Sequence, residues 1–395
     1  MKKKLLAVAV AGALAAPGLA LAQSSVTISG VFKMSLENLR IGSPNAPRAG
    51  LNTSENRLAD DSSRILFNVV EDLGGGLQAI GQADMRVTLG AGGVTALGNN
   101  HVGLQSKTLG RIFVGRQDVH YFNTESNLTA LAGDLRADSI SLLAFMRDGT
   151  AIANATRTPN IIHYTTPNFG GFTVLAAYST GPSTATTPTG QGDLASAIRK
   201  GNAFTLNPNY KAANWQVGWS FWNSKPDVGG ATVATGDQRS NRLYGSFNIA
   251  GFKIGLAWDK SRIKSSTGGA GIAGVAGIGG VVGGPIASGT ELGNRTAWSI
   301  PISYTMGNNG FHFHYTIARN DTATTAQDGA KMVALSYQYT LSKRTSVGLS
   351  YAKIRNDAGA AYNFFTSTSL GNSAGAAITA GEDPRLFAGT IRHAF

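Results

Sequence analysis

The chain has 395 residues with 51 glycines, no cysteine, 14% charged residues and a formal net charge of +12. Without cysteine it is not a disulfide-stabilised secreted domain, and its apolar content with low charge density excludes a disordered chain. A polytopic helical membrane protein is also excluded, because only the extreme N-terminus approaches the run of about 20 apolar residues that a spanning helix needs.

The N-terminal sequence has the features of an export signal. Lys2, Lys3 and Lys4 precede the apolar run 5–19, and an Ala-Leu-Ala sequence ends at Ala22. This layout predicts a cleaved signal peptide over residues 1–22 and favours it over a membrane anchor, because the run is short and rich in alanine. Removal of three lysines lowers the net charge from +12 to about +9 (12 − 3).

The rest of the chain, residues 23–395, is predicted as one domain built on strict alternation. In segment 331–341, Val333 and Leu335 share one face with other apolar residues, and Ala334 and Ser336 share the other. This period of two is the signal of a β-strand, and helical spacing is absent from the segment.

Sixteen such segments occur, most with the length of a tilted strand that crosses a bilayer. The predicted strands are 26–36, 62–70, 77–89, 101–107, 111–116, 159–166, 172–180, 201–210, 215–222, 240–249, 252–263, 295–306, 311–320, 331–341, 346–356 and 385–395. Short connections such as 211–214 and 342–345 alternate with long ones such as 37–61 and 264–294. The pattern predicts an all-β fold, a transmembrane antiparallel β-barrel of 16 strands with short periplasmic turns and long external loops.

A soluble β-sandwich or propeller is the alternative, because alternation alone does not distinguish a lipid-facing surface from a buried one. The signal peptide, the rhythm of long and short connections, and the aromatic residues near strand ends favour the membrane.

Several segments resemble the general porins of β-proteobacteria, in the neisserial-type Gram-negative porin family. The matching segments are 25–32 (SVTISGVF), 63–64 with 71–77 (SR and EDLGGGL), 102–104 with 115–118 (VGL and GRQD), 157–172 (RTPNIIHYTTPNFGGF) and 391–395 (IRHAF). The resemblance implies a 16-stranded homotrimeric barrel in the outer membrane, passive diffusion of small hydrophilic solutes, and an insertion signal ending at Phe395.

The chain departs from this family at two places. Residues 97–101 carry no arginine where relatives often have one, and the stretch 119–156 lacks a Pro-Glu-Phe-Gly motif. The stretch 117–156 is nevertheless the longest without clean alternation, and a loop of that length in a compact fold is usually functional. By resemblance it is the constriction loop that folds into the lumen.

On this interpretation, four acidic residues of the loop form one wall of the constriction: Glu125, Asp134, Asp138 and Asp148. Arginines form the facing wall: Arg64, Arg86, Arg111 and Arg157 are assigned to it by strand parity, and Arg116 is added although it lies at the end of its strand, where parity no longer applies. Arginine keeps its charge when crowded, so an excess of arginine at a narrow pore predicts anion preference. The alternatives are solvated loop acids and arginines held in salt bridges at the rim.

Other motifs are not taken as sites. Residues 269–274 fit G-x-G-x-x-G but lie in a glycine-rich run without the strand and helix that a dinucleotide site requires. His312 and His314 share a strand face but lack a clear third metal ligand. No nucleophile elbow or basic stripe is present, so we expect no enzyme, no cofactor, no metal and no nucleic-acid partner.

The sequence therefore predicts a general diffusion porin of the outer membrane with weak anion preference. Its expected partners are two further copies of itself, outer-membrane lipid and lipopolysaccharide, and small hydrophilic solutes and ions. A solute-specific channel with a saturable site is the alternative, with Trp222 and Tyr244 as the inward aromatic residues that it would need. A third alternative is a barrel with a structural or adhesive role.

Overall fold

A computed structural model gives the architecture of the chain. It describes residues 24–42, 53–60, 62–95, 98–128, 140–143, 157–182, 201–225, 236–265, 269–270, 285–286, 289–325, 327–364 and 378–395. The predicted signal peptide lies outside the described residues, as do Asp134, Asp138 and Asp148. None of the described helices is long and apolar enough to cross a membrane.

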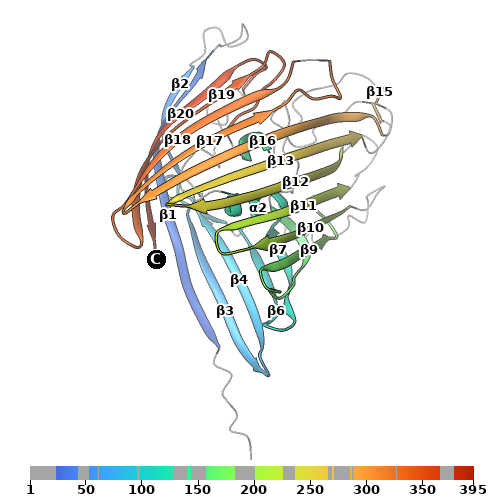
Figure 1. Ribbon diagram of the computed structural model, residues 1–395, viewed down its shortest axis with the longest axis vertical. Helices are drawn as coiled ribbons and strands as arrows, with labels where there is room; N and C mark the ends of the chain where they lie inside the picture. The colour runs from blue at the N-terminus through green and yellow to red at the C-terminus, as the bar shows by residue number, and fades with distance from the viewer. Residues whose placement is uncertain are drawn as a thin grey trace, which may run out of the picture.

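Eighteen strands form one antiparallel sheet that closes on itself (Figure 1). They are β1 (Ser25–Gly42), β2 (Ser54–Asp60), β3 (Arg64–Gly74), β4 (Leu77–Val87), β5 (Val94–Thr95), β6 (Asn100–Ser106), β7 (Gly110–Asp118), β8 (Arg157–Thr165), β9 (Phe172–Ser179), β10 (Asn202–Lys211), β11 (Trp215–Lys225), β12 (Gly236–Ile249), β13 (Phe252–Ser265), β16 (Glu291–Met306), β17 (Asn309–Ala318), β18 (Ala330–Thr340), β19 (Thr345–Asn356) and β20 (Asp383–Ala394).

These strands occupy sixteen positions in the wall. β2 and β3 pair with successive parts of β1, and β5 and β6 pair with successive parts of β4, so each pair is one interrupted strand (18 − 2 = 16). β1 also pairs with β20 over twelve residues, from Val31 opposite Ala394 to Gly42 opposite Asp383, which closes the ring. The predicted 16-stranded barrel is confirmed.

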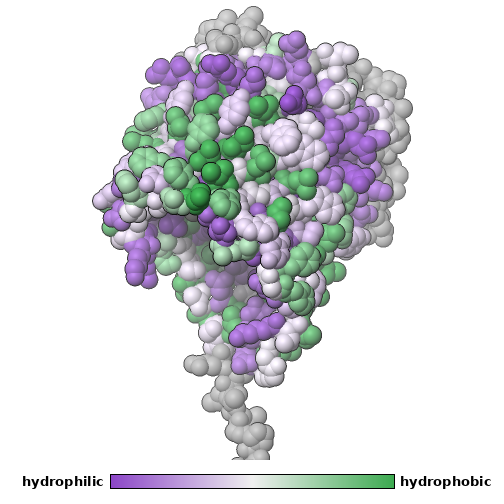
Figure 2. All heavy atoms as spheres, viewed as in Figure 1, coloured by the Kyte–Doolittle hydropathy of each residue, from purple (hydrophilic) through white to green (hydrophobic). Residues whose placement is uncertain are grey.

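The two faces of the wall differ as the alternation predicts. Along β18 the outward side chains of Val333 and Leu335 are 37% and 52% exposed, whereas Met332, Ala334 and Ser336 point inward and are buried. Figure 2 shows apolar side chains gathered on the outer wall, with hydrophilic ones towards the end that carries the long connections. An apolar exterior around a polar interior is the arrangement of a membrane barrel.

Two helices lie against the inner face of the wall. α2 (His120–Leu128) follows β7 directly and contacts β10 to β13, and α3 (Ile140–Leu143) contacts β16 to β18 (Figure 1). Leu142 and Leu143 are fully buried there. The sequence predicted no helix in 117–156, because neither short helix has a clear apolar stripe of its own.

Some predicted boundaries were wrong. β1 continues to Gly42 and β2 begins at Ser54, so the predicted loop 37–61 is much shorter. Its ends remain in the hydrogen-bonded ladder even though their outward residues, such as Asn38 and Arg40, are polar. In the glycine-rich run, β14 (Gly269–Ala270) pairs with β15 (Pro285–Ile286), which no dinucleotide-binding turn would do.

The seam between β1 and β20 generates a prediction. Gly30 and Phe395 exchange backbone hydrogen bonds of 3.0 and 3.1 Å, and a Cβ on Gly30 would come within 2.5 Å of the Phe395 ring and of the Arg64 carbonyl oxygen. We expect Gly30→Val to prevent closure of the barrel and to abolish the heat-modifiable folded band on SDS gels. The reason is that the backbone of the neighbouring strand cannot move away from the new side chain without a large cost in stability. Gly389→Ala on β20 is the matched control, since its Cβ would find its nearest neighbour at 3.8 Å; equal folding of both variants would contradict the prediction.

Candidate functional site

An arginine cluster lies where β3 and β8 begin and where β4 and β7 end. Arg64 on β3 stands directly opposite Arg86 on β4, and the charges of Arg64 and Arg157 both act on Arg86. Arg157 also acts on Arg116. Arg64 lies on the inward face of β3, since Phe67 and Val69 on the other face are exposed outward.

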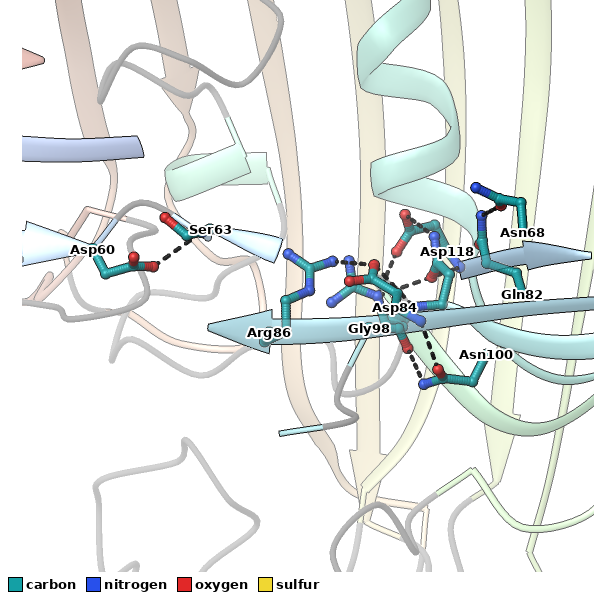
Figure 3. Close-up of polar contacts among 11 residues, drawn as sticks. Asp60, Ser63, Asn68, Gln82, Asp84, Arg86, Gly98, Asn100 and Asp118 are labelled. Carbon is teal, nitrogen blue, oxygen red and sulfur yellow. Dashed lines mark hydrogen bonds and ion pairs between the residues drawn. The ribbon is translucent and has the colours of Figure 1, made fainter. Parts of the chain in front are cut away.

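Two carboxylates lie among these arginines. Arg86 Nη2 lies 2.8 Å from Asp84 Oδ2, and Arg157 Nε lies 2.8 Å from Asp118 Oδ1. Asn99 joins the two pairs, because its side-chain NH₂ donates to Asp118 (2.8 Å) and its backbone N–H donates to Asp84 (3.2 Å). Figure 3 shows Asp84, Asp118 and Arg86 turned toward one another. Four cations face two anions, which leaves a net charge of +2 (4 − 2).

The backbone geometry shows why parity alone does not fix the orientation of Arg157 and Arg116. The register between β7 and β8 shifts between Gly115 and Gln117, and Asn160 on β8 has a positive φ of 53°. Such a bulge inverts the alternation beyond it and re-aims the side chains. Parity counted from Ile162 therefore gives no valid orientation for Arg157, whose place comes from its contacts with Asp118 and Asn99.

Arg111 lies apart from the cluster, near the short-turn end of β7. Its Nη2 is 2.6 Å from His101 Nε2, and its guanidinium lies 4.8 Å from the centroid of the Phe113 ring. Phe113 in turn stacks on His163 at 4.3 Å. The structure thus brings four of the five predicted arginines together and places the fifth in a separate aromatic group.

The acidic residues near the arginines differ from the predicted ones. Glu125 lies in α2, but its side chain is outside the described residues. Asp84 and Asp118 are the described carboxylates beside the arginines, and both are on wall strands. Asp84 was detectable in the sequence, because it precedes Arg86 by two residues and so shares its face.

Hydrogen bonds fasten α2 to the opposite wall. The His120 ring lies 2.8 Å from Ser220 Oγ on β11 and 2.9 Å from Ser240 Oγ on β12. The Tyr121 hydroxyl donates to Asp259 Oδ2 on β13 at 3.0 Å. α2 therefore extends from β7 across the interior to strands that lie far along the ring.

A second contact holds α3. The Arg295 guanidinium on β16 donates to the carbonyl oxygens of Leu142 and Leu143, and it lies 5.8 Å from the Tyr362 ring. Arg295 is fully buried, and the carbonyl groups of the loop that it holds accept hydrogen bonds from two of its N–H groups.

Burial sets the protonation of the fastening residues. Desolvation, together with the nearby Arg242 charge, lowers the pKa of His120 well below its ordinary value of 6.5. Desolvation and the neighbouring Asp259 raise the pKa of Tyr121 above its ordinary value. Both side chains are therefore neutral near neutral pH, and each can serve as a hydrogen-bonding anchor without an uncompensated charge.

The remaining candidate features do not form a binding site. Among the residues that the structure describes, no group of three or more His, Cys, Asp or Glu could hold a metal ion, and His312 and His314 both point inward on β17. Trp222 and Tyr244 also point inward, but they pack in buried clusters, Trp222 with Val119 and Tyr244 with Leu128. Trp222 and Tyr244 are 1% and 3% exposed, so packing covers both side chains in the described part of the chain.

The chain is similar to known proteins over most of its length. The family model described as Gram-negative porin matches residues 7–359. Outer membrane porin protein 32 of Delftia acidovorans is 34% identical over 187 residues, which are 45% of this chain and 50% of that protein. An outer membrane porin of Bordetella pertussis is 29% identical over 196 residues, 45% of this chain and 48% of that protein. The chain thus spans about half the length of the curated relatives it matches.

Solved structures share the fold. An anion-selective porin from Comamonas acidovorans superposes with a TM-score of 0.72 and 22% identity, covering 94% of this chain and all (100%) of that one. The outer membrane protein OmpT of Vibrio cholerae, in its trimer form, gives 0.62 and 12% identity over 94% and 99% of the two chains. At these identities the likeness establishes the barrel fold.

The α2 anchor generates a prediction. Tyr121→Phe removes one hydrogen bond to the buried Asp259 carboxylate, so we expect the free energy of unfolding in urea to fall by about 1–2 kcal/mol. Tyr351→Phe is the control, because Tyr351 points outward and is exposed. Equal stability of the two variants would show that the Tyr121 hydroxyl does not fasten the loop.

The neutral His120 ring generates a second prediction. Once exposed by unfolding, the ring binds a proton below about pH 6.5, whereas the buried ring resists it, so the stability that His120 contributes falls as the pH drops below that value. His120→Gln, which retains a donor and an acceptor for the two serines, should lose less stability between about pH 7.5 and pH 5. Parallel melting curves for wild type and variant over this range would contradict the assignment.

Proposed function

Because this chain belongs to the Gram-negative porin family, we propose that it forms a water-filled outer-membrane channel for general diffusion of small hydrophilic solutes and ions, with a preference for anions. The observation that carries the proposal is the excess of arginine over carboxylate in the cluster of Arg64, Arg86, Arg116 and Arg157. The anion-selective porin with the same fold supports this direction of selectivity.

The barrel has the dimensions that transport needs. Side chains alone fill a barrel of 8 strands, whereas barrels of 16 strands leave an aqueous channel. A diffusion channel requires no reacting group. The family to which the chain belongs consists of channel proteins, so the proposal includes no enzymatic activity.

The loop 117–156 is the element that we assign to the constriction. α2 leaves the wall beside the arginine cluster at Asp118 and crosses to Ser220, Ser240 and Asp259, so the loop occupies part of the lumen at the level of the cluster. Water-filled space next to the cluster is then narrow, and charges within about 8 Å of an ion's path act on it at physiological salt.

The four arginines of the cluster differ in whether a nearby carboxylate offsets their positive charge. Arg86 and Arg157 each have a carboxylate at 2.8 Å, while Arg64 and Arg116 make no ion pair with any described carboxylate. We therefore attribute the electric field that acts on an entering anion chiefly to Arg64 and Arg116. The assembly is proposed as a homotrimer, by analogy with the trimeric form of a barrel of the same fold.

The function is tested by the zero-current potential of the purified protein in a planar bilayer across a tenfold KCl gradient. Conductance with a potential of anion-selective sign supports the proposal, and conductance steps that occur in threes support the trimer. A cation-selective sign would retain the channel and refute the charge assignment. Absence of conductance from folded protein would refute the channel.

The charge assignment predicts a ranking of variants. A unit charge about 8 Å from the path is worth about 0.5 kcal/mol in water, which screening at physiological salt reduces to about 0.2 kcal/mol. Because the charge acts with opposite sign on anions and cations, this corresponds to about a twofold change in the anion-to-cation permeability ratio. Arg64→Gln should therefore lower that ratio about twofold, Arg157→Gln should lower it less because Asp118 already offsets Arg157, and the double variant should lower it most. The control is Lys343→Gln with Arg344→Gln, which removes two exposed charges in the turn before β19. Reversal potentials that match those of the control would refute the ranking.

A further inference from the structure

Asn99 lies where the pairing of β4 with the next strand is irregular. Thr95 on β5 stands opposite Arg86, and His101 on β6 stands opposite Gln82. Between these two pairs the chain takes six steps on one side and four on the other, so it carries two extra residues (6 − 4 = 2). Extra residues of this kind interrupt the ladder and re-aim side chains, and they are frequent next to functional sites.

β7 is irregular on the other side of Asn99. Asn100 stands opposite Arg116, so Asn99 lies beside the last residues of β7. The register of β7 against β8 shifts between Gly115 and Gln117. Regular pairing is thus broken on both sides of Asn99, which lets its side chain reach residues of two other strands.

Asn99 makes four hydrogen bonds to the arginine cluster and its carboxylates. Its side-chain NH₂ donates to Asp118 Oδ2 at 2.8 Å, and its backbone N–H donates to Asp84 Oδ2 at 3.2 Å. Its Oδ1 accepts from the Asp118 backbone N–H and from Arg157 Nε, both at 3.0 Å. One neutral residue therefore contacts two carboxylates and one guanidinium.

Asp118 is the more accessible of these two carboxylates. Figure 3 shows Asp118 and Asp84 turned toward one another, and their side chains are 26% and 2% exposed. Arg157 Nε donates to Asp118 Oδ1 at 2.8 Å, and the Asn99 NH₂ donates to Oδ2. Both oxygens thus accept a hydrogen bond, and loss of the Asn99 amide would leave Oδ2 open to a cation in the lumen.

We propose that Asn99 is a positioning residue for ion selectivity, which keeps Asp118 on Arg157 and covers this carboxylate against permeating cations. The inference rests on the proposed function, because it names the residue that lets the arginine cluster determine which ions pass. An amide suits the role, since it donates to a carboxylate and accepts from a guanidinium without adding charge of its own.

A neutral substitution separates this role from a simple count of charges. Asn99→Ala leaves the net charge of the cluster unchanged, so a count of charges predicts an unchanged selectivity. The proposed role predicts a weaker preference for anions, because the uncovered Asp118 Oδ2 attracts cations into the constriction. A purely structural role in the irregular segment would alter folding and leave the selectivity of the folded channel unchanged.

The test compares the zero-current potentials of wild type, Asn99→Ala and Asn68→Ala in a planar bilayer across a tenfold KCl gradient. Asn68 is the matched control, because its Oδ1 on the inner face of β3 accepts from Gln82 at 2.8 Å and neither Asp84 nor Asp118 is its partner. We expect Asn99→Ala to lower the anion-to-cation permeability ratio about twofold and Asn68→Ala to leave it unchanged. Equal potentials for the two variants would overturn the proposal.

The effect must also pass through Asp118. In the Asp118→Asn background no carboxylate remains to be uncovered at that position, so Asn99→Ala should then leave the permeability ratio unchanged. Independent effects would instead add. The same twofold fall in both backgrounds would show that Asn99 acts by another route and would overturn the proposal.

A second variant covers the case in which Asn99→Ala fails to fold, as judged by the heat-modifiable band. Asn99→Leu keeps the volume of the side chain and removes its donor and acceptor, and Asn68→Leu is its control. The permeability ratio should fall about twofold for the first and stay unchanged for the second. Equal ratios would overturn the proposal.

The wild-type potential separates this inference from the proposed function. An anion-selective wild type with no difference between the Asn99 and Asn68 variants would retain the proposed function and overturn the role of Asn99. A wild type without anion preference would refute the proposed selectivity, and the difference between the variants would still decide whether Asn99 covers Asp118.

Discussion

In a hydrocarbon environment each unpaired backbone N–H or C=O group costs several kcal/mol, so a sheet that spans a membrane cannot keep a free edge. The seam between β1 and β20 meets this constraint, with β1 paired to β3 and β2 on one side and to β20 on the other. Phe395 completes the seam by its backbone hydrogen bonds to Gly30. Closure fixes the register of every strand, and the register then decides whether each side chain points outward or into the lumen.

A polar interior follows from that division, and it is what allows a loop to be held inside. α2 has no apolar stripe strong enough to fold alone, but His120 and Tyr121 find hydroxyl and carboxylate partners on three inward-facing strands. Arg295 holds α3 by its carbonyl groups. The loop therefore depends on the wall for its shape, and the wall presents the arginine cluster beside the point where the loop departs.

The sequence predicted what depends on period two and failed where that period is broken. All sixteen wall positions were predicted, because apolar and polar faces alternate along each. The helices α2 and α3 were not, since their stability comes from distant strands and not from local spacing. Arg157 was assigned by parity across a bulge at Gly115, where parity does not hold. Arg111 directly follows the short connection 108–110, so the sequence placed it near a short turn and away from the long-loop ends, but it did not show the contact with His101.

The same residue type serves two surfaces, and one residue of register separates them. Arg64 and Arg86 are opposed on the inner face, where Asp84 pairs with Arg86 and Arg64 makes no ion pair with a described carboxylate. Arg40 and Arg385 are opposed on the outer face, near the long-loop ends of β1 and β20. Both pairs would be destabilising in a sheet surrounded by water alone. The strict alternation of the strands keeps the two sets apart, because a shift of one residue in register would move each arginine to the opposite face of the wall.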